Sequence, residues 1–415
     1  MSFDLNAVRA KFPALAIKDD GQRRIYLDNP AGTQVPSGVA TAMAECLLRA
    51  NANLGGNFPS SIAADEIVAS AREAMADFLN AASSREIVFG QNMTTITLHL
   101  SRSIGRLMRP GDEIILSRMD HDANVWPWVL LARDLDLTIK WLPFSPETYE
   151  FDLNDLDELL TDRTRLICVG GASNLTGTLN DIASICARAR AEGVLTFIDA
   201  VQSAPHVATD VQAIGCDFLV CSPYKFFGPH QGVLWGRLSV LERLEPYKVR
   251  PAPDSVPGCF ETGTQSHEGF AGIKAAIDYF EWIGTSMAGA GSGRAALRAA
   301  MALLFDYEMS LATHLIEGLQ SINGVTVQGV TAADAMDRRV PTVSFTHARH
   351  TPAAIAESLI SRNIFVWHGH NYALEVARTL GVLESGGVVR VGPVHYNSQE
   401  ELDELLAALR QILAA

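Results

Sequence analysis

The sequence is poor in cysteine for its length and lacks long apolar runs. Its six cysteines are scattered among 415 residues, with no Cys-x-x-Cys pair and no spacing typical of a metal site. In a chain of this length they indicate free thiols in a reducing compartment rather than a disulfide framework. No uncharged apolar stretch reaches the roughly 18 residues of a membrane span, and the first residues contain no apolar signal-peptide core. We therefore expect a cytoplasmic protein with no membrane partner.

Positive charge is also scarce. The 33 lysines and arginines are outnumbered by 47 acidic residues, which gives a formal charge of −14. Nucleic acids and anionic membranes bind basic faces, so neither is an expected partner. An anionic small molecule is not excluded, because it needs only a local cluster of donors. The remaining composition, 48% hydrophobic and 19% charged, is that of an ordinary globular protein.

Short β-rich runs alternate with helical stretches from about residue 85 to 240. Most of the runs are almost continuously apolar, which is typical of strands buried on both faces of a mainly parallel sheet. The predicted strands are Glu86–Phe89, Glu113–Leu116, Thr138–Leu142, Arg165–Val169, Leu195–Ile198, Asp217–Val220 and Val233–Trp235. Because stretches of helical spacing separate them, the pattern predicts an α/β domain with helices on both sides of the sheet. Functional residues of such domains collect at the carboxyl ends of the strands.

A second, smaller alternation follows a long helical region, which is expected from about Gly269 to Ile322 with a break at the small residues 288–293. Its predicted strands are Val325–Val327, Pro341–Phe345, Ile364–Trp367 and Val388–Val391, and its predicted helix caps are Thr351 and Ser398. A single core rarely exceeds about 300 residues. We therefore expect a large domain over residues 26–285 and a small α/β domain over 286–415, with residues 1–25 packing on the small domain.

The most specific segment follows the strand predicted at Asp217–Val220. It reads Cys-Ser-Pro-Tyr-Lys-Phe-Phe-Gly-Pro-His-Gln-Gly over residues 221–232 and places Lys225 among aromatic side chains. A lysine that forms a Schiff base must be neutral part of the time, and partial desolvation lowers its pKa in that direction. A surface lysine in a Gly/Pro turn is the alternative interpretation of this segment alone.

Three other segments end or follow strands of the same domain. Asp199 ends an apolar strand, where a carboxylate can pair with a protonated pyridine nitrogen or simply cap the strand. His121 lies in the segment 119–124, where an imidazole can stack on a cofactor ring and shuttle protons, or be an ordinary loop histidine. The segment Asn92–Thr97 offers hydroxyls and backbone N–H groups to a phosphate at a helix N-terminus, although a plain helix cap would have the same composition.

Taken in order, these segments resemble the class V aminotransferases, particularly their cysteine desulfurase and selenocysteine lyase branch. The similarity runs nearly end to end, from residues 26–32 to Arg390 and beyond. It implies the fold type I architecture of pyridoxal 5'-phosphate (PLP) enzymes, in which a large domain with a mainly parallel seven-stranded sheet between helices is joined to a smaller α/β domain. It also implies PLP as the cofactor and an amino acid as the substrate.

The resemblance assigns roles to individual residues. Lys225 would carry the cofactor as a Schiff base, Asp199 would hold its pyridine nitrogen, and His121 would stack on its ring. Arg390 would clamp the substrate's α-carboxylate, a task that suits a bidentate fork. Thr264 matches a threonine that reaches the phosphate of the neighbouring subunit, which implies a homodimer with shared sites. The other cofactor-binding matches are Met93, Thr94, Asn174, Gln202, Ser222 and Tyr224, of which Asn174 would also contact the substrate.

The sequence departs from the family where desulfurases carry the cysteine that accepts sulfur. The matching run is Gly-His-Asn-Tyr-Ala over residues 369–373, so Tyr372 stands in place of that cysteine. A phenol with a pKa near 10 cannot accept sulfur as a thiolate does. Tyr224 likewise replaces the histidine that usually precedes the lysine. The pair His368 and His370 has no evident third ligand, so no metal site is expected.

We expect a PLP-dependent lyase that removes a β-substituent from an amino acid without a protein persulfide. Lys225 would take the α-proton, and Tyr372 would act as a general acid or as part of the pocket wall. A cysteine desulfurase that uses Cys259 or an external thiol is one alternative, and an aminotransferase or epimerase is another. A silent PLP-binding protein is the non-enzyme alternative, which the retained Lys225, Asp199 and Arg390 disfavour.

Overall fold

Seven strands form the central sheet of the computed structural model, which describes residues 3–414. Their order is β4-β10-β9-β8-β7-β5-β6. The strands are β4 (Ile87–Gly90), β5 (Glu113–Ser117), β6 (Thr138–Leu142), β7 (Thr164–Gly170), β8 (Leu195–Asp199), β9 (Phe218–Cys221) and β10 (Gly232–Gly236). The pairs from β6 across to β9 are parallel, and β10 is antiparallel to both of its neighbours. The predicted mainly parallel seven-stranded sheet is confirmed.

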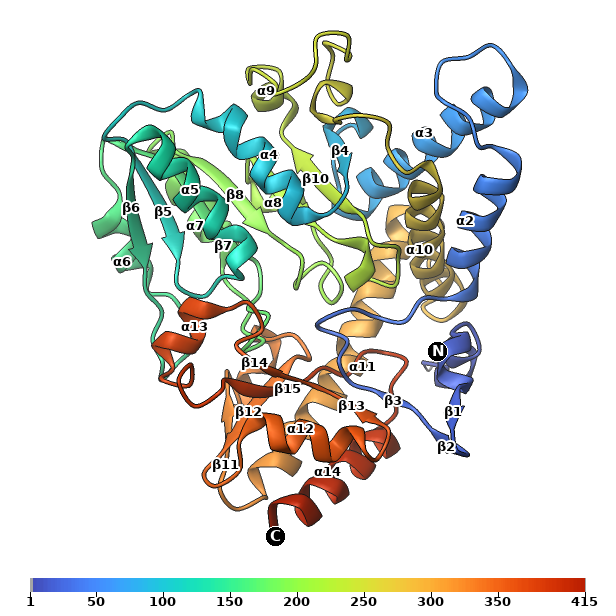
Figure 1. Ribbon diagram of the computed structural model, residues 1–415, viewed down its shortest axis with the longest axis vertical. Helices are drawn as coiled ribbons and strands as arrows, with labels where there is room; N and C mark the ends of the chain where they lie inside the picture. The colour runs from blue at the N-terminus through green and yellow to red at the C-terminus, as the bar shows by residue number, and fades with distance from the viewer. Residues whose placement is uncertain (1–2, 415) are drawn as a thin grey trace.

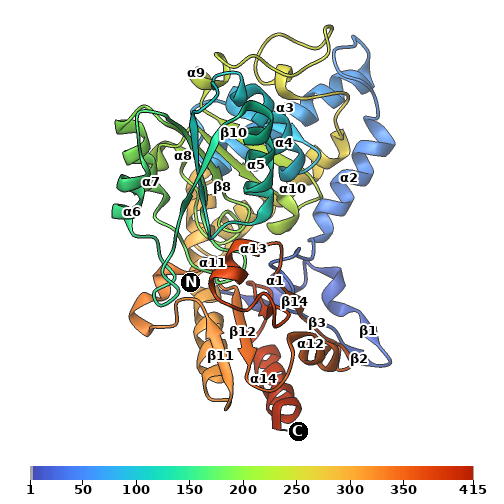
Figure 2. The same cartoon turned by 60° about the vertical axis from the view of Figure 1, so that its left-hand side comes forward.

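Different helices cover the two faces of this sheet. Along β7, Leu166 and Cys168 share an apolar cluster with side chains of α4 (Met93–Gly105) and α5 (Trp126–Leu135). The alternate residues, Ile167 and Val169, share another cluster with α3 (Pro59–Leu79) and α10 (His267–Ser286). Because both faces are buried, the strands are apolar at successive positions, which is why they appear as continuous apolar runs. Figure 1 looks onto the face that α4 and α5 cover, and Figure 2 shows the layers from the side.

A four-stranded antiparallel sheet forms the smaller unit, which lies below the central sheet in Figure 1. Its order is β11-β12-β15-β14, with strands β11 (Val325–Gln328), β12 (Val343–His347), β14 (Trp367–Gly369) and β15 (Val388–Val391). Helices α12 (Pro352–Ile360) and α14 (Gln399–Ala414) pack against it. The predicted caps are confirmed, because Thr351 accepts a hydrogen bond from the Ala354 amide and Ser398 forms a capping box with Glu401.

The prediction of one strand over Ile364–Trp367 is wrong. The chain instead changes sheets at Val366, so that β13 (Ile364–Phe365) pairs with β3 (Ile25–Tyr26) and β14 pairs with β15. The apolar run Ile364–Trp367 covers β13, Val366 and the first residue of β14. Such a run predicts extended backbone but contains no information about which strand will be its partner.

The long helical region is broken where the sequence predicts. Helix α10 ends at Ser286, α11 (Arg294–Gln320) begins after the small residues, and Gly289 and Gly293 there have positive φ angles. The first half of α11 packs into the core of the central sheet, and its second half packs into the core of the smaller unit. The domain boundary predicted at residue 286 therefore stays a prediction, because one helix serves both cores.

The N-terminal residues also contact both units. Val8 and Phe12 belong to the apolar cluster of the central sheet, whereas Ile25 and Leu27 belong to that of the smaller unit. The remaining elements are α1 (Leu5–Arg9), α2 (Ser37–Arg49), α6 (Leu153–Leu159), α7 (Ile182–Ala191), α8 (Val211–Ile214), α9 (Leu238–Leu241), α13 (Leu374–Thr379), β1 (Lys18–Asp19) and β2 (Gln22–Arg23). None of the helices in residues 3–414 is long and apolar enough to cross a membrane.

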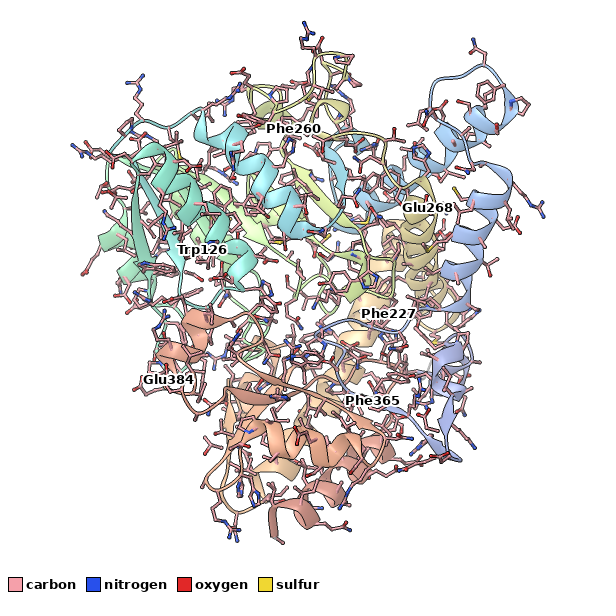
Figure 3. All side chains as sticks on the ribbon, viewed as in Figure 1. Trp126, Phe227, Phe260, Glu268, Phe365 and Glu384 are labelled. Atoms are coloured by element: carbon pink, nitrogen blue, oxygen red, sulfur yellow. The ribbon has the colours of Figure 1, made fainter. Side chains whose placement is uncertain are left out.

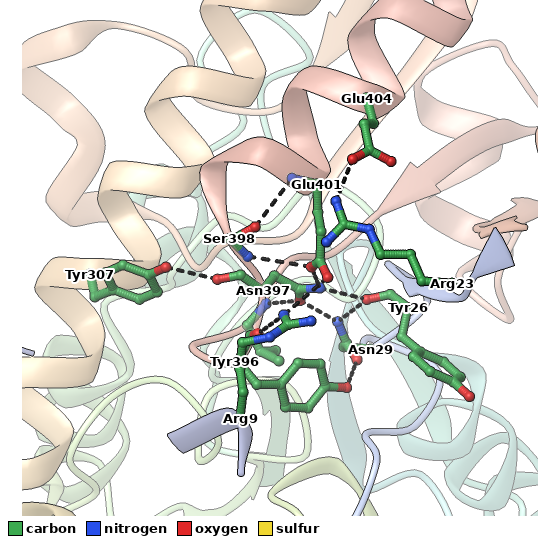
Figure 4. A network of polar contacts seen from close by, with 11 residues as sticks. Arg9, Arg23, Tyr26, Asn29, Tyr307, Tyr396, Asn397, Ser398, Glu401 and Glu404 are labelled. Carbon is green, nitrogen blue, oxygen red and sulfur yellow. Dashed lines mark hydrogen bonds and ion pairs between the residues drawn. The ribbon is translucent and has the colours of Figure 1, made fainter. Parts of the chain in front are cut away.

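A buried polar network joins the N-terminal segment to the end of the small sheet (Figure 4). Asn29 donates to the Gly392 carbonyl at 2.6 Å, and Asn397 donates to the Tyr26 carbonyl at 3.0 Å. Arg9 forms an ion pair with Glu401 at 3.0 Å, while Asn397 also donates to the Glu401 carboxylate. These bonds hold residues 26–29 beside the strand that carries Arg390.

Candidate functional site

A cavity of about 520 Å³ opens at the carboxyl edge of the central sheet. The predicted site residues that line it are Met93, Thr94, His121, Asn174, Asp199, Gln202, Ser222, Tyr224, Lys225, Tyr372 and Arg390. They come from strand ends, helix starts and loops of both units, so the fold brings together residues that are up to about three hundred positions apart. Thr264 does not line the cavity and is exposed on the surface before α10.

Lys225 ends the short 3-10 turn that follows β9. Its ammonium nitrogen Nζ donates a hydrogen bond to the Pro30 carbonyl. Burial and, to a smaller extent, the charge of Arg390 lower the pKa of Lys225 to about 7, against the opposing carboxylates of Asp28 and Asp199. At neutral pH a substantial fraction of this amine is therefore unprotonated, as a nucleophile toward a carbonyl group must be.

Asp199 is the last residue of β8 and is buried. Its Oδ1 accepts a hydrogen bond from the Val201 amide at 2.9 Å. The pKa of Asp199 is raised to about 6 by burial, which outweighs the lowering by the Val201 amide and the charge of Lys225. Close by, the amide nitrogen of Gln202 donates to Thr342 Oγ1 at 2.9 Å and so connects the cavity floor to the smaller unit.

His121 precedes a 3-10 turn and faces the cavity. Its Nδ1 accepts a hydrogen bond from the Ala123 amide at 3.0 Å, so the proton of the neutral ring belongs on Nε2. Burial lowers the pKa of His121 to about 3, and the charges of Lys225 and Arg390 act in the same direction. The side chain is thus a neutral imidazole that offers an N–H donor.

The first turn of α4 is suited to bind an anion. Asn92 caps the helix by accepting from the Thr95 amide at 2.9 Å. The amides of Met93 and Thr94 belong to the first turn, whose N–H groups have no partner within a helix and attract phosphate. Gly232 allows the close approach of β10 here, because a Cβ atom at that position would lie 2.4 Å from the Asn92 carbonyl carbon.

Arg390, on β15, is only 4% exposed and is incompletely paired. Its Nη1 donates to the Asn174 carbonyl at 3.2 Å, and its Nη2 lies 3.5 Å from Asp28 Oδ1. Among the described residues Arg390 Nε has no hydrogen-bond partner, and the same holds for the Oδ1 atoms of Asn174 and Asn371. Buried polar atoms are rarely left unpaired. All three residues line the cavity, so these atoms are suited to contact a polar ligand.

The loop after β14 forms the outer wall of the cavity. Asn371 and Tyr372 both adopt positive φ angles, of 51° and 59°. The Tyr372 ring is 67% exposed and is stacked on His121, with ring centroids 5.5 Å apart and planes inclined by 17°. The Tyr372 carbonyl accepts from the Asp122 amide at 2.7 Å. The loop is therefore fixed directly to the segment that carries His121.

Other aromatic side chains surround the entrance. Trp367 is exposed and lines the cavity, and Tyr224 is stacked on His230 with centroids 5.0 Å apart. Trp126, which Figure 3 labels, is also exposed but lies on α5 outside the cavity lining. The guanidinium of Arg133 lies over its ring. Sequence reasoning assigned no role to Asp28, His230 or Asn371. Asp28 lay inside the segment 26–32 on which the family resemblance rests, but nothing local indicated that it would meet Arg390.

Thiols are absent from the cavity wall formed by residues 3–414. All six cysteines are buried and unpaired, and none lines the cavity. Cys259 lies in an apolar cluster with Val256 and Phe260, and burial raises the pKa of its thiol.

Comparisons with known proteins show which family and which solved structures the chain resembles. The family model described as aminotransferase class-V matches residues 25–405. A cysteine desulfurase of Yersinia pseudotuberculosis is 31% identical over 427 aligned residues, which cover 99% of each chain. The apo structure of a cysteine desulfurase from Thermococcus onnurineus NA1 has a TM-score of 0.89 at 27% identity and covers 100% of both chains. The cysteine desulfurase CsdA from Escherichia coli, in an S-sulfonic acid form, has a TM-score of 0.85 at 26% identity and covers 100% of this chain and 99% of its own.

Proposed function

Because the chain belongs to the class V aminotransferase family of PLP-dependent enzymes, we propose that it is an amino-acid lyase that works without a protein persulfide. Its sequence and its fold are similar to those of cysteine desulfurases along the whole chain. The absence of a protein persulfide is inferred from one loop of the cavity wall. Tyr372 occupies the loop where the family resemblance places a sulfur-accepting cysteine, and no cysteine of residues 3–414 lines the cavity.

The residues at the cavity fit PLP. Lys225 would hold the cofactor through Nζ, and its lowered pKa supports reaction with an aldehyde. Asp199 has one oxygen bound to the Val201 amide and a second available to a pyridine nitrogen. The first turn of α4 and the Ser222 side chain would bind the phosphate. When bound, PLP supplies the electron sink that stabilises negative charge at the substrate's α carbon.

Substrate binding is proposed to rest on Arg390. Its Nε and Nη groups would form a fork around the substrate's α-carboxylate, which would satisfy the nitrogen that now lacks a partner. The Oδ1 atoms of Asn174 and Asn371 are suited to accept from the substrate's amino group or from the cofactor. Asp28, which lies 3.5 Å from Arg390, keeps the guanidinium near the N-terminal segment and balances part of its charge.

Proton transfer is proposed to use Lys225 and Tyr372. The Lys225 amine, when it is not bonded to the cofactor, would take the proton from the substrate's α carbon. His121 acts as a hydrogen-bond donor through Nε2 rather than as a base, because its Nδ1 is occupied and its pKa is lowered to about 3. The Tyr372 phenol lines the cavity and has an O–H group that is suited to protonate the departing sulfur or selenium. With cysteine and water as reactants, the products would be hydrogen sulfide, pyruvate and ammonia.

A cysteine desulfurase that passes sulfur to an external thiol is the second candidate. The names of the similar proteins support it, because the relative and both structures described above are cysteine desulfurases. The two candidates differ in their carbon products. Removal of sulfur alone leaves alanine, whereas β-elimination leaves pyruvate.

We also propose a homodimer, on two observations. Exposed large apolar side chains follow one another from α2 into α3, a concentration that is typical of an interface. They are Leu47, Leu48, Leu54, Phe58 and Ile62. Thr264 is exposed outside its own cavity, which supports the family role of a threonine that reaches the neighbour's phosphate.

The proposed substrate is an amino acid, and the unpaired buried thiols support a cytoplasmic location.

Product analysis tests the proposed reaction. The purified holoenzyme is incubated with cysteine, and pyruvate and alanine are quantified together with sulfide. We expect pyruvate and sulfide in equal amounts, and a strong loss of rate in Tyr372→Phe, which keeps the ring and removes the acidic proton. Tyr372→Cys is the matched control, because it places a thiol in the loop. Alanine as the dominant product of the wild-type enzyme would contradict the lyase and favour the desulfurase.

A further inference from the structure

Asp120 has no part in the proposed chemistry, although it directly precedes His121 and is only 3% exposed. Its Oδ1 accepts hydrogen bonds from Ser117 Oγ at 2.6 Å and from the Gly170 amide at 2.7 Å. Its Oδ2 accepts from Asn124 Nδ2 at 2.6 Å. Both carboxylate oxygens are thus engaged by donors that come from the end of β5, the end of β7 and the turn after His121.

These bonds connect the His121 segment to the strand beside Asp199. Gly170 ends β7, lines the cavity and is the ladder partner of Asp199 on β8. On the other side, Asn124 Oδ1 accepts from the indole of Trp128 at 3.3 Å, which anchors the turn in the apolar layer over the sheet. The carboxylate of Asp120 is therefore the common acceptor between the floor of the cavity and the loop that presents His121.

The carboxylate of Asp120 is unusual because it is an ionisable group in the protein interior. The pKa of Asp120 is raised to about 7, mainly by burial and also by the charge of Asp199, although the three hydrogen bonds act in the opposite direction. The ionisable groups that face it are Asp199 on β8 and the Cys168 thiol on β7. Within residues 3–414 no lysine or arginine forms an ion pair with it. Burying a carboxylate without a cation is costly. Because Asp120 and Asp199 repel each other electrostatically, together they favour a positively charged group near them.

We propose that Asp120 is a positioning residue of the cofactor site, which orients the His121 loop and places a second negative charge beside Asp199 to favour the protonated pyridine ring of PLP. The inference rests on the PLP site of the proposed function, but it is independent of which reaction the enzyme catalyses.

Moving the negative charge from position 120 to position 124 separates the orienting role of Asp120 from its electrostatic role. Asp120→Asn removes the charge and turns an amide N–H group toward Asn124 Nδ2, so that two donors face each other. The double variant Asp120→Asn/Asn124→Asp restores a donor–acceptor pair, and its new carboxylate can still accept from Trp128. The negative charge then lies on the far side of residue 120 from Gly170, and so further from Asp199.

The readouts are the dissociation constant of PLP and the pH at which the absorbance of bound PLP changes. Asp120→Asn is expected to weaken PLP binding about tenfold or more, since a charged hydrogen-bond acceptor is lost. Its pH midpoint is expected to fall by about one unit, since the protonated cofactor loses an anionic neighbour. The double variant is expected to bind PLP with an affinity within about threefold of wild type. The pH at which its absorbance changes should stay as low as in Asp120→Asn.

Three results would overturn the proposal. They are an Asp120→Asn variant equal to wild type in both readouts, a double variant that restores the midpoint, and a double variant that fails to recover the affinity. If Asp120→Asn alone does not fold, the double variant is compared with wild type, and the same midpoint and affinity criteria apply. Failure of the wild-type protein to bind PLP would instead contradict the proposed function, and so the two are distinguishable.

Discussion

Replacement of Arg390 by lysine tests the proposed carboxylate clamp most sharply. The change keeps the positive charge beside Asp28 and removes the planar fork that Nε and Nη form. It also removes the bond from Nη1 to the Asn174 carbonyl, so the cavity wall loses one contact as well. Lysine presents a single ammonium group to a carboxylate and cannot bind both oxygens in the same way.

The expected magnitude follows from the hydrogen bonds lost. A hydrogen bond to a charged group contributes about 1.5–3 kcal/mol, and each 1.4 kcal/mol corresponds to a factor of ten in affinity. Loss of one of the two fork bonds should therefore weaken amino-acid binding by roughly 10- to 100-fold. Binding is measured by titrating amino acids into the holoenzyme and following the absorbance of bound PLP.

Arg378→Lys is the matched control. Arg378 is a surface arginine on α13 that pairs with Glu375, so its replacement should change binding less than about twofold. Thermal melting of both variants establishes that they are folded. An Arg390→Lys protein that is folded and binds amino acids as tightly as wild type would refute the role of Arg390.

Three further predictions follow from the same site and surface. Lys225→Ala should bind PLP without the visible absorbance band of the lysine-bound cofactor, and an unchanged band would contradict the assignment of Lys225. In wild-type apoprotein the rate of PLP attachment should rise with pH through about 7, where the Lys225 amine loses its proton because its pKa is lowered, and stopped-flow absorbance can follow it. Leu48→Glu, at a side chain that is 80% exposed on α2, should shift the protein from dimer to monomer in analytical ultracentrifugation. Leu107→Glu, at an exposed leucine outside the α2–α3 face, should leave the dimer intact, and a dimeric Leu48→Glu would refute the interface.

The central sheet was predictable because its strands are buried on both faces. Each predicted strand agrees with the observed one to within one residue at either end, as at Thr138–Leu142 and Leu195–Asp199. Lys225 and Asp199 could be selected as candidate site residues because a lysine among aromatics and an acid after an apolar strand are locally unusual, and both line the cavity. Their meeting at one edge of the sheet follows from parallel strands, whose carboxyl ends share that edge.

Contacts between distant segments were not predictable in the same way. The pairing of β13 with β3 and of β14 with β15 depends on tertiary packing, which an apolar run does not encode. The proximity of Asp28 to Arg390 depends on the Asn29–Gly392 and Asn397–Tyr26 bonds between the two ends of the chain. Asp120 belonged to a segment chosen for its histidine, and its burial became evident only from the three donors that surround it.

The absence of a protein persulfide is the central claim, and mass spectrometry of the intact enzyme tests it most directly. The holoenzyme is incubated with cysteine, quenched with an alkylating reagent, and weighed beside Cys259→Ala and the Tyr372→Cys control. The account predicts no added sulfur on the wild-type chain while pyruvate is released, because the cavity wall contains a phenol in place of a thiol. A wild-type mass increased by one sulfur atom, which disappears in Cys259→Ala, would contradict the account and identify a desulfurase that uses Cys259.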